Sequence, residues 1–512
     1  MDYSMNKEFL SAKDVIFDGC QEQPVDLDFS LPDYCPDIQK ILKCQVYPHI
    51  NMKNISGDRL DVDGTAVVRL LYMDSVKMSV RCCEHSIPFS CTFNLKSAPQ
   101  NAISFVKANV EYINCRAISP RRLDIHGAFS VCAKIVSKCE QEIASGIDEA
   151  EMQQKKIIDT ASNMVGMGQQ MFSINETLEI GQGKPAAQAI VRTDVSASIN
   201  DYKIITNKLI LKGEAFVKVL YISDMDEGNL ETMEYSIPIS QILDIDGIDE
   251  TCDCSVSIDV MAHNIEIKSD SSGNDTLLDA EIKLSAQAIA YEEKEIELIE
   301  DAYSTEYEIS PEYKQITVPH LLENISDTYI NKSVIEMPQS GVSKVEDIWN
   351  EVSSVTSKKE NNNIVFRGKI NICILARDNE NTPFYIERPI DFEYEHNWEG
   401  KEENINCEAS INSLTISFRI DGTSGIEVRS DMKMNADVYA NNSYKVIQDV
   451  SVDKDSPKQK DTTAALTIYF AEQGESVWNI ARKYCTSAEA IKQENDLSCD
   501  VLENSGMILI PM

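Results

Sequence analysis

The sequence predicts a mainly β protein, with three tandem antiparallel β-sandwich-like repeats and a small C-terminal domain of order strand–helix–helix–strand. Three observations predict this class: a glycine-led strand pattern that returns twice, alternating apolar residues within each copy, and helical spacing near the end of the chain. We expect repeats at residues 1–145, 146–300 and 301–450, a flexible linker at 451–464 and the C-terminal domain at 465–512.

The repeats are recognised by short markers that return in one order. Gly64-Thr-Ala-Val-Val-Arg-Leu-Leu-Tyr72 recurs 149 residues later from Gly213, and again 155 residues further on from Gly368. A second marker around Pro88 recurs around Pro238. Markers that keep the same order and nearly the same spacing indicate a duplicated structural unit, with the third copy the most divergent.

Alternating apolar residues predict strands inside each copy. Ala66, Val68 and Leu70 share one face, which is the period of a half-buried strand, and turn residues such as those at 224–228 separate these runs. The apolar spacing in Pro36–Leu42 predicts a short helical piece, and Glu151–Met164 is compatible with a helix or with a connecting arm. The polar segment 451–464 lacks apolar rhythm and predicts a flexible tether.

Composition and charge favour a soluble chain whose partners are proteins. Among 512 residues, 47 Lys and Arg stand against 84 Asp and Glu, for a net charge of −37. This charge repels phosphate backbones and anionic membranes, so we expect no nucleic-acid partner. The start of the sequence lacks the pattern of a signal peptide, and no run is long and apolar enough to cross a bilayer. Fifteen scattered cysteines then indicate reduced thiols in a cytosol.

The last 47 residues form a recognisable βααβ pattern. Leu466, Ile468 and Phe470 alternate as a strand, Ser476 and Ser487 stand at helix N-cap positions, and the chain closes on an apolar strand that ends at Pro511. Cys485 stands at a helix end, where a glycine is the usual left-handed residue.

This terminal pattern resembles the LysM domain family, best known for binding N-acetylglucosamine polymers. The repeats resemble the SPOCS domain family of spore-forming Firmicutes, most distinctly in Leu31-Pro-Asp-Tyr-Cys-Pro-Asp-Ile-Gln-Lys-Ile-Leu42. Repeated SPOCS-like domains followed by a LysM domain are similar to clostridial spore coat morphogenetic proteins. The resemblance implies a cytoplasmic scaffold of the mother cell at the forespore surface, whose LysM domain binds the morphogenetic coat ATPase SpoIVA, with other coat proteins as further partners.

In LysM modules the binding groove lies between the loop after the first strand and the loop before the last. The resemblance therefore implies a partner-binding surface that includes both loops, the start of the first helix and a residue of the first strand. Its candidate residues are Ile468, Gly474, Glu475, Ser476, Val477, Trp478, Asn495, Asp496 and Leu497. Trp478 is compatible with a partner contact or with core packing, and so is Ile468.

No catalytic constellation is evident in the sequence, and we expect neither an enzyme nor a cofactor. The histidines form no His-Glu-x-x-His pair. Cys82, Cys83, His85 and Cys91 are the best metal candidates, but they lack paired Cys-x-x-Cys knuckles, and the pattern favours thiols packed in or beside a sheet. The alternative function is that of a peptidoglycan-binding protein of the cell wall or spore cortex.

Overall fold

The computed structural model describes residues 4–181, 183–336, 341–402, 404–421, 425–458 and 466–511, without the side chains of residues 353, 354, 413 and 421. Within the described residues, eighteen strands precede the C-terminal domain, six in each repeat. The first repeat holds β1 (Met5–Ser30), β2 (Ile38–Ser56), β3 (Arg59–Asp74), β4 (Val80–Asn94), β5 (Ala102–Ser119) and β6 (Arg122–Ile147). The second holds β7 (Met152–Glu179), β8 (Ala189–Ile205), β9 (Lys208–Asp224), β10 (Asn229–Asp244), β11 (Asp253–Lys268) and β12 (Leu277–Ser304). The third holds β13 (Tyr307–Glu336), β14 (Lys344–Glu360), β15 (Asn363–Arg377), β16 (Pro383–Asn397), β17 (Asn406–Asp421) and β18 (Gly425–Pro457).

Each repeat is a sandwich of two antiparallel three-stranded sheets. One is a meander, β2-β3-β4 in the first repeat, and the other pairs the first, sixth and fifth strands, β1-β6-β5. The order recurs as β8-β9-β10 with β7-β12-β11, and as β14-β15-β16 with β13-β18-β17. Apolar residues of both sheets form one core, as in the cluster that joins Leu70 of β3 to Ile125 of β6. The predicted fold class, including the sandwich, is confirmed.

The copies also share β-bulges, which explain a wrong prediction. An unpaired extra residue stands at the same place in β2, β8 and β14, namely Leu42, Val191 and Glu346. In β2 a further shift lies just after Ile38. Two extra residues so close together break the alternation of a strand and imitate helical spacing. The helix predicted at Pro36–Leu42 is therefore the start of a bulged strand.

The three meander sheets meet in a head, where their central strands come together. Leu71, Leu220 and Leu375 occupy equivalent positions in β3, β9 and β15, and they pack into one buried cluster. Tyr72 donates a hydrogen bond from Oη to the Pro36 carbonyl at 3.2 Å, and Tyr221 makes the same contact with Pro185 at 2.9 Å. The repeats are thus copies of one unit packed against one another.

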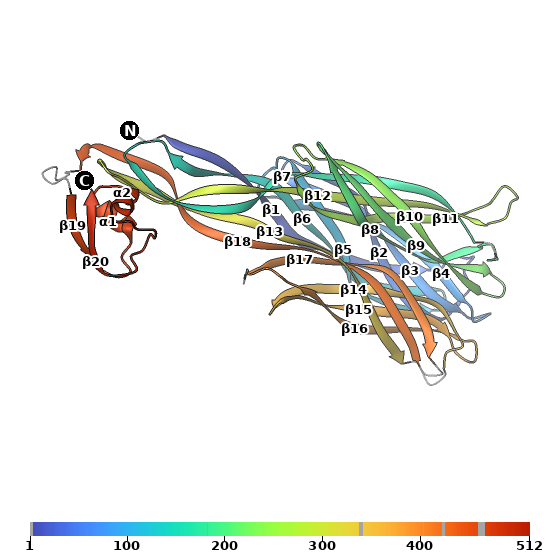
Figure 1. Cartoon of the computed structure of the whole chain (residues 1–512). Helices are drawn as coiled ribbons and strands as arrows, with labels where there is room; N and C mark the ends of the chain where they lie inside the picture. Colours follow the sequence, from blue (N-terminus) through green and yellow to red (C-terminus); the bar gives the residue numbers. More distant parts are fainter. Residues whose placement is uncertain are drawn as a thin grey trace.

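Beyond the head, six long strands run together as a stalk towards the C-terminal domain, which lies at its end beside the N-terminus (Figure 1). These strands are β1, β6, β7, β12, β13 and β18. All three repeats contribute to each apolar layer of the stalk. One layer contains Leu10, Ile143, Ala161, Ile296, Leu298, Ile316, Val318 and Val446. Glu151–Met164, for which a helix or an arm was expected, lies almost wholly in β7 of this stalk.

Two further expectations need correction. The segment predicted as a tether begins within β18, which continues to Pro457, and Lys458 N donates a hydrogen bond to Glu306 O at 2.7 Å. Residues 459–465 of that tether lie outside the described residues. The cysteines are also not all reduced, because Cys20 and Cys132, which face each other across β1 and β6, form a disulfide.

The C-terminal domain consists of β19 (Leu466–Ala471), α1 (Val477–Lys483), α2 (Ala488–Glu494) and β20 (Gly506–Pro511). β19 and β20 pair in antiparallel fashion, and their inner face packs on both helices. Ser487 caps α2 as predicted, because its Oγ accepts a hydrogen bond from Ala490 N at 3.0 Å. Ser476 stands at the N-cap of α1, but its side chain makes no cap hydrogen bond. Cys485 adopts the expected left-handed conformation, with φ of 52°.

Candidate functional site

The outer face of the β19–β20 sheet is apolar and exposed. Its large side chains include Ile468, Phe470 and Met507, which are 65%, 66% and 75% exposed. Phe470 lies opposite Met507, and Ile468 lies opposite Leu509, so these side chains form one continuous surface. We call Leu466, Ile468, Phe470, Met507 and Leu509 the outer sheet face. Exposed apolar surfaces of this kind usually mark a site of interaction.

Sequence reasoning named Ile468 of this face but missed Phe470 and Met507. The signal was present in the alternation of β19, where Thr467, Tyr469 and Ala471 have the opposite phase and face the helices. Alternation alone does not say which of the two faces is buried, because both are apolar here. The face that contains Ala471 is the buried one, because the two helices cover it.

Several of the other candidate residues hold the domain together. Val477 is fully buried in the domain core. Asn495 ties α2 to β20, since its Nδ2 donates to the carbonyls of Ile491 and Leu509 and its Oδ1 accepts from Leu509 N. Leu497 packs against the same core, and Asp496 is exposed with φ of 51°.

The two loops of the expected groove are bonded to each other. Gly474, with φ of 87°, donates from N to Leu502 O at 2.8 Å, and Leu502 N returns a bond to Glu475 O at 2.9 Å. Ser476 pairs with Val501 in an isolated bridge. Glu475 also accepts a hydrogen bond from Tyr469 Oη at 3.0 Å. Much of the loop backbone is therefore used within the domain.

Trp478 faces the stalk rather than bulk solvent. Its Nε1 donates to Asp301 Oδ2 at 2.9 Å, and its ring meets the Tyr303 ring edge-on at 4.8 Å between centroids. Arg482 forms an ion pair with Asp301, and Tyr303 Oη donates to Thr486 O at 2.8 Å. We call these five residues the latch. No pattern in the sequence links Asp301 to Trp478, which is 177 residues away.

The Asp301 carboxylate is the electrostatic centre of the latch. Burial alone would raise its pKa, but hydrogen bonds from Arg482 and Trp478 stabilise the charged form and lower the pKa below its ordinary value. The charged latch is thus the stable form at neutral pH.

An open cleft of about 550 Å³ lies between the C-terminal domain and the stalk. The domain contributes Ser476, Trp478, Asn479 and Val501. The stalk contributes Lys155, Glu300, Asp301, Tyr313 and Lys445. Aromatic rings beside polar side chains suit a sugar or an extended peptide.

The predicted metal candidates do not form one cluster among the described residues. Cys83 and Cys91 are buried in the core of the first repeat, Cys82 packs on the central cluster of the head, and the His85 ring lies 5.4 Å from that of Phe29. Within the described part of the chain, the group whose ligand atoms come within 4.8 Å of one another is Glu351, Cys373 and Glu387.

Protein groups already stabilise the charges of that Glu351–Cys373–Glu387 group. Lys43 forms a 2.5 Å ion pair with Glu387, and Tyr385 Oη donates to the same oxygen at 3.0 Å. Glu351 accepts hydrogen bonds from Gln45 and Trp349. Since Lys43 already supplies a cation there, this cluster serves as a contact between the first and third repeats.

No helix in the described residues is long and apolar enough to span a membrane. Comparison with known proteins assigns two kinds of domain. A family model described as SipL, SPOCS domain matches residues 37–118 and 186–268, and a model of the LysM domain matches residues 471–510. No curated protein and no solved structure matches the chain. Segments of the first and second repeats therefore match the SPOCS domain, and the C-terminal domain matches the LysM domain, a combination that indicates a sporulation protein interacting with other proteins.

Proposed function

We propose that this chain is a non-enzymatic scaffold of spore coat assembly, which binds the coat ATPase SpoIVA through its LysM domain. It would act in the mother-cell cytoplasm at the forespore surface, where the head repeats would bind other coat proteins. The SPOCS and LysM matches support this proposal, because such domains imply a sporulation protein that interacts with other proteins.

The outer sheet face is the observation that carries the proposal. Ile468, Phe470 and Met507 are each about two-thirds exposed or more, which disfavours a role limited to holding the domain together. Large apolar side chains at the centre of an interface commonly supply most of its binding energy. A polysaccharide, which is rich in hydroxyl groups, would leave many polar groups unpaired on such a face.

The latch supports the scaffold role by fixing the direction of this face. Trp478 and Arg482 contact the stalk through α1, whereas the outer sheet face lies on the opposite side of β19 and β20 from the helices. A partner on that face would be held at a set distance and angle from the head. A pre-oriented site loses less entropy on binding than a freely tethered one.

A second candidate function is peptidoglycan binding. It is favoured by the LysM match and by the cleft that contains Trp478 and Tyr313. The two functions use different surfaces of the same domain, and this separates them experimentally.

The test compares binding of the full-length chain to purified SpoIVA and to purified peptidoglycan. We expect Phe470→Glu to weaken SpoIVA binding by at least about 30-fold, equivalent to about 2 kcal/mol, because it places a charge in an apolar contact. Ile158→Glu is the matched control, since Ile158 is 63% exposed on the stalk. Unchanged SpoIVA binding by Phe470→Glu would contradict the proposal, and so would sedimentation of the wild-type chain with peptidoglycan alone.

A further inference from the structure

The segment Leu31–Leu42 contains one aromatic side chain, and the fold does not bury it. Leu31, Cys35, Ile38 and Leu42 are buried in the head. Tyr34, in the middle of the segment, is 86% exposed. The loop packs its aliphatic and thiol side chains inward and projects its only aromatic ring into solvent.

The loop that carries Tyr34 is firmly held by Arg121. The Arg121 guanidinium donates to the carbonyls of Pro32 and Cys35 at 2.8 and 2.9 Å, and it pairs with the Asp37 carboxylate at 2.9 Å. The backbone is fixed at both ends as well, because Leu31 N donates to Arg121 O and Ile38 N donates to Pro120 O. A loop fixed in this way loses little further entropy when its exposed side chain is bound.

A second fixed loop joins this one through a hydrogen bond from Ser75 N to Asp37 O at 2.9 Å. It is the turn between β3 and β4, and its tip exposes Val76 and Met78, which are 76% and 40% exposed. Met78 has φ of 55°, a left-handed conformation that is unfavourable for a non-glycine residue and that the surrounding bonds must enforce.

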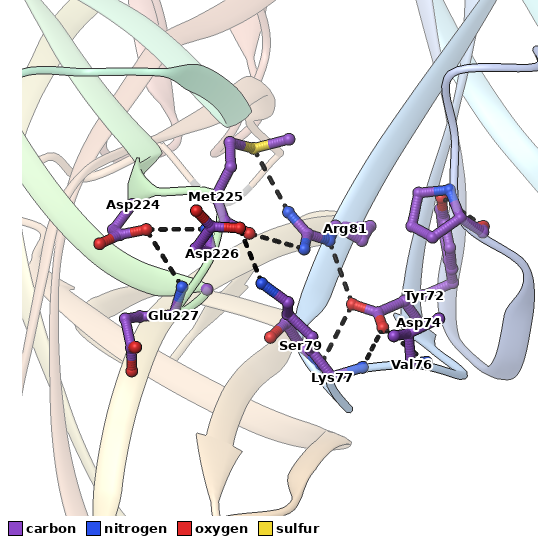
Figure 2. Close-up of polar contacts among 12 residues, drawn as sticks. Tyr72, Asp74, Val76, Lys77, Ser79, Arg81, Asp224, Met225, Asp226 and Glu227 are labelled. Carbon is purple, nitrogen blue, oxygen red and sulfur yellow. Dashed lines mark hydrogen bonds and ion pairs between the residues drawn. The ribbon is translucent and has the colours of Figure 1, made fainter.

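Asp74 supplies those bonds from a buried position (Figure 2). Its carboxylate accepts from Val76 N at 2.9 Å and from Lys77 N at 2.7 Å. It also accepts from Arg81 Nε at 3.1 Å. Arg81 in turn donates to Met225 O at 2.9 Å, so the turn is braced against the second repeat.

The second repeat lacks the aromatic part of this surface at the equivalent place. The position of Tyr34 falls on Gly183 when the repeats are aligned by their 149-residue offset. Its own β9–β10 turn is engaged by both neighbouring repeats, since Met225 O accepts from Arg81 and Gly228 O accepts from Arg377 at 3.2 Å. The exposed aromatic ring therefore distinguishes the first repeat from the second, whereas the turn keeps an exposed apolar residue in both, since Met225, equivalent to Val76, is 42% exposed.

We propose that Tyr34, Val76 and Met78 form a docking surface for a protein partner that offers an apolar pocket bordered by lysine or arginine. The charge beside the surface favours a basic partner. Asp33 is exposed beside Tyr34, whereas Asp226, which is 91% exposed, is balanced by its ion pair with Lys77 next to Val76. A chain of net charge −37 also attracts basic surfaces over long range. This surface belongs to the head and does not depend on the function proposed for the LysM domain.

The test is photo-crosslinking in sporulating cells, with a photoreactive amino acid in place of Tyr34 in the full-length chain. Tyr112, which is 54% exposed on β5 of the same repeat, is the matched control position. We expect position 34, and not position 112, to crosslink to one protein through a peptide that contains lysine or arginine. The purified partner should then bind Tyr34→Ala at least 10-fold more weakly than wild type, and Asp33→Lys should weaken binding further as salt is lowered.

Several outcomes would overturn the proposal: equal crosslinking at both positions, an acidic crosslinked peptide, crosslinking to a second copy of this chain, or equal affinity of wild type and Tyr34→Ala. Because Tyr34 is exposed, Tyr34→Ala should melt at the wild-type temperature, so a loss of binding would not reflect unfolding. Phe470→Glu should leave the crosslink unchanged, which distinguishes failure of this proposal from failure of the LysM proposal.

Discussion

The stalk and the head join the same three repeats with different proportions of apolar and ionic contacts. In the stalk, layers such as the one with Leu298 and Val446 contain apolar side chains from every repeat. In the head, the repeats also meet through buried ion pairs, where Arg192 reaches Asp347 at 3.0 Å while stacking on Trp349 at 3.8 Å. Apolar burial is non-directional, whereas a hydrogen-bonded ion pair requires one geometry. Apolar packing in the stalk therefore holds the repeats together, and the ion pairs of the head fix the angle between them.

The largest effect should follow from removing one partner of the buried pair. Asp347→Ala leaves Arg192 and Lys218 without the carboxylate that they share, at a cost of about 3–5 kcal/mol. That variant leaves two cations, Arg192 and Lys218, with the carboxylate of Asp194, and adding Arg192→Met should recover much of the loss because it restores the balance of charge. Urea unfolding followed by circular dichroism measures both variants.

The stalk provides the control for this experiment. Leu298→Ala should cost about 2–5 kcal/mol, and adding Val446→Ala in the same layer should lower the stability further. The second substitution thus raises the stability of the head variant but lowers the stability of the stalk variant further. If Arg192→Met instead lowered the stability of Asp347→Ala, the head contacts would be ordinary packing and the distinction between the two regions would fail.

A smaller effect should appear as a pH dependence confined to the head. His263 of the second repeat lies against His49 of the first, with 4.9 Å between ring centroids, and its Nε2 is 3.1 Å from Thr193 Oγ1. Burial lowers the pKa of His263 to about 3, with smaller contributions from His49 and Arg69. The unfolded chain then binds a proton that the folded chain does not, so stability is complete above about pH 6.5 and falls as the pH drops towards 3.

Through His263, the change from pH 6.5 to 5 should cost about 2 kcal/mol, and His263→Asn should remove this part of the slope, while His49, whose pKa burial also lowers, keeps its own contribution. The exposed His126 is the matched control, and His126→Asn should leave the slope in place. Stability measured by urea unfolding at both pH values decides the matter. If the dependence of stability on pH were unchanged in His263→Asn, the acid sensitivity would come from other groups.

The features that the sequence predicted correctly are those whose pattern is contained in a short stretch of the chain. The marker that begins at Gly64 marks the central strands β3, β9 and β15, whose alternation is clear because their neighbours on both sides are from the same sheet. The LysM pattern was equally readable because strand, caps and helices lie within 47 residues. Bulges misled the reading at Pro36–Leu42, where extra residues altered the period.

The stalk and the latch were not predictable in this way. A stalk strand such as β7 is covered by other repeats along part of its length, so its burial follows no simple period. The latch joins Asp301 and Trp478, which are brought together only after the repeats have packed. Contacts of this kind depend on the whole fold and leave no local pattern. The outer sheet face lies between these cases, because its alternation was visible but its exposure was not.

The latch combines both ways of joining, and it should give the smallest effect. Tyr303 and Trp478 supply an aromatic contact, and Asp301 supplies a directional pair with Arg482. Asp301→Asn removes the charge but keeps the shape, so we expect a loss of about 1 kcal/mol in docking and faster hydrogen exchange in α1. The folded pKa of Asp301 is lowered, so its contribution to docking should be present in full above about pH 4 in wild type and should be lost as the pH falls through that lowered value. The Asn variant should show no such transition.

Glu489→Gln, on the exposed side of α2, is the control. If Asp301→Asn and wild type exchanged at equal rates, the contacts of Tyr303 would be enough to hold the LysM domain in its orientation.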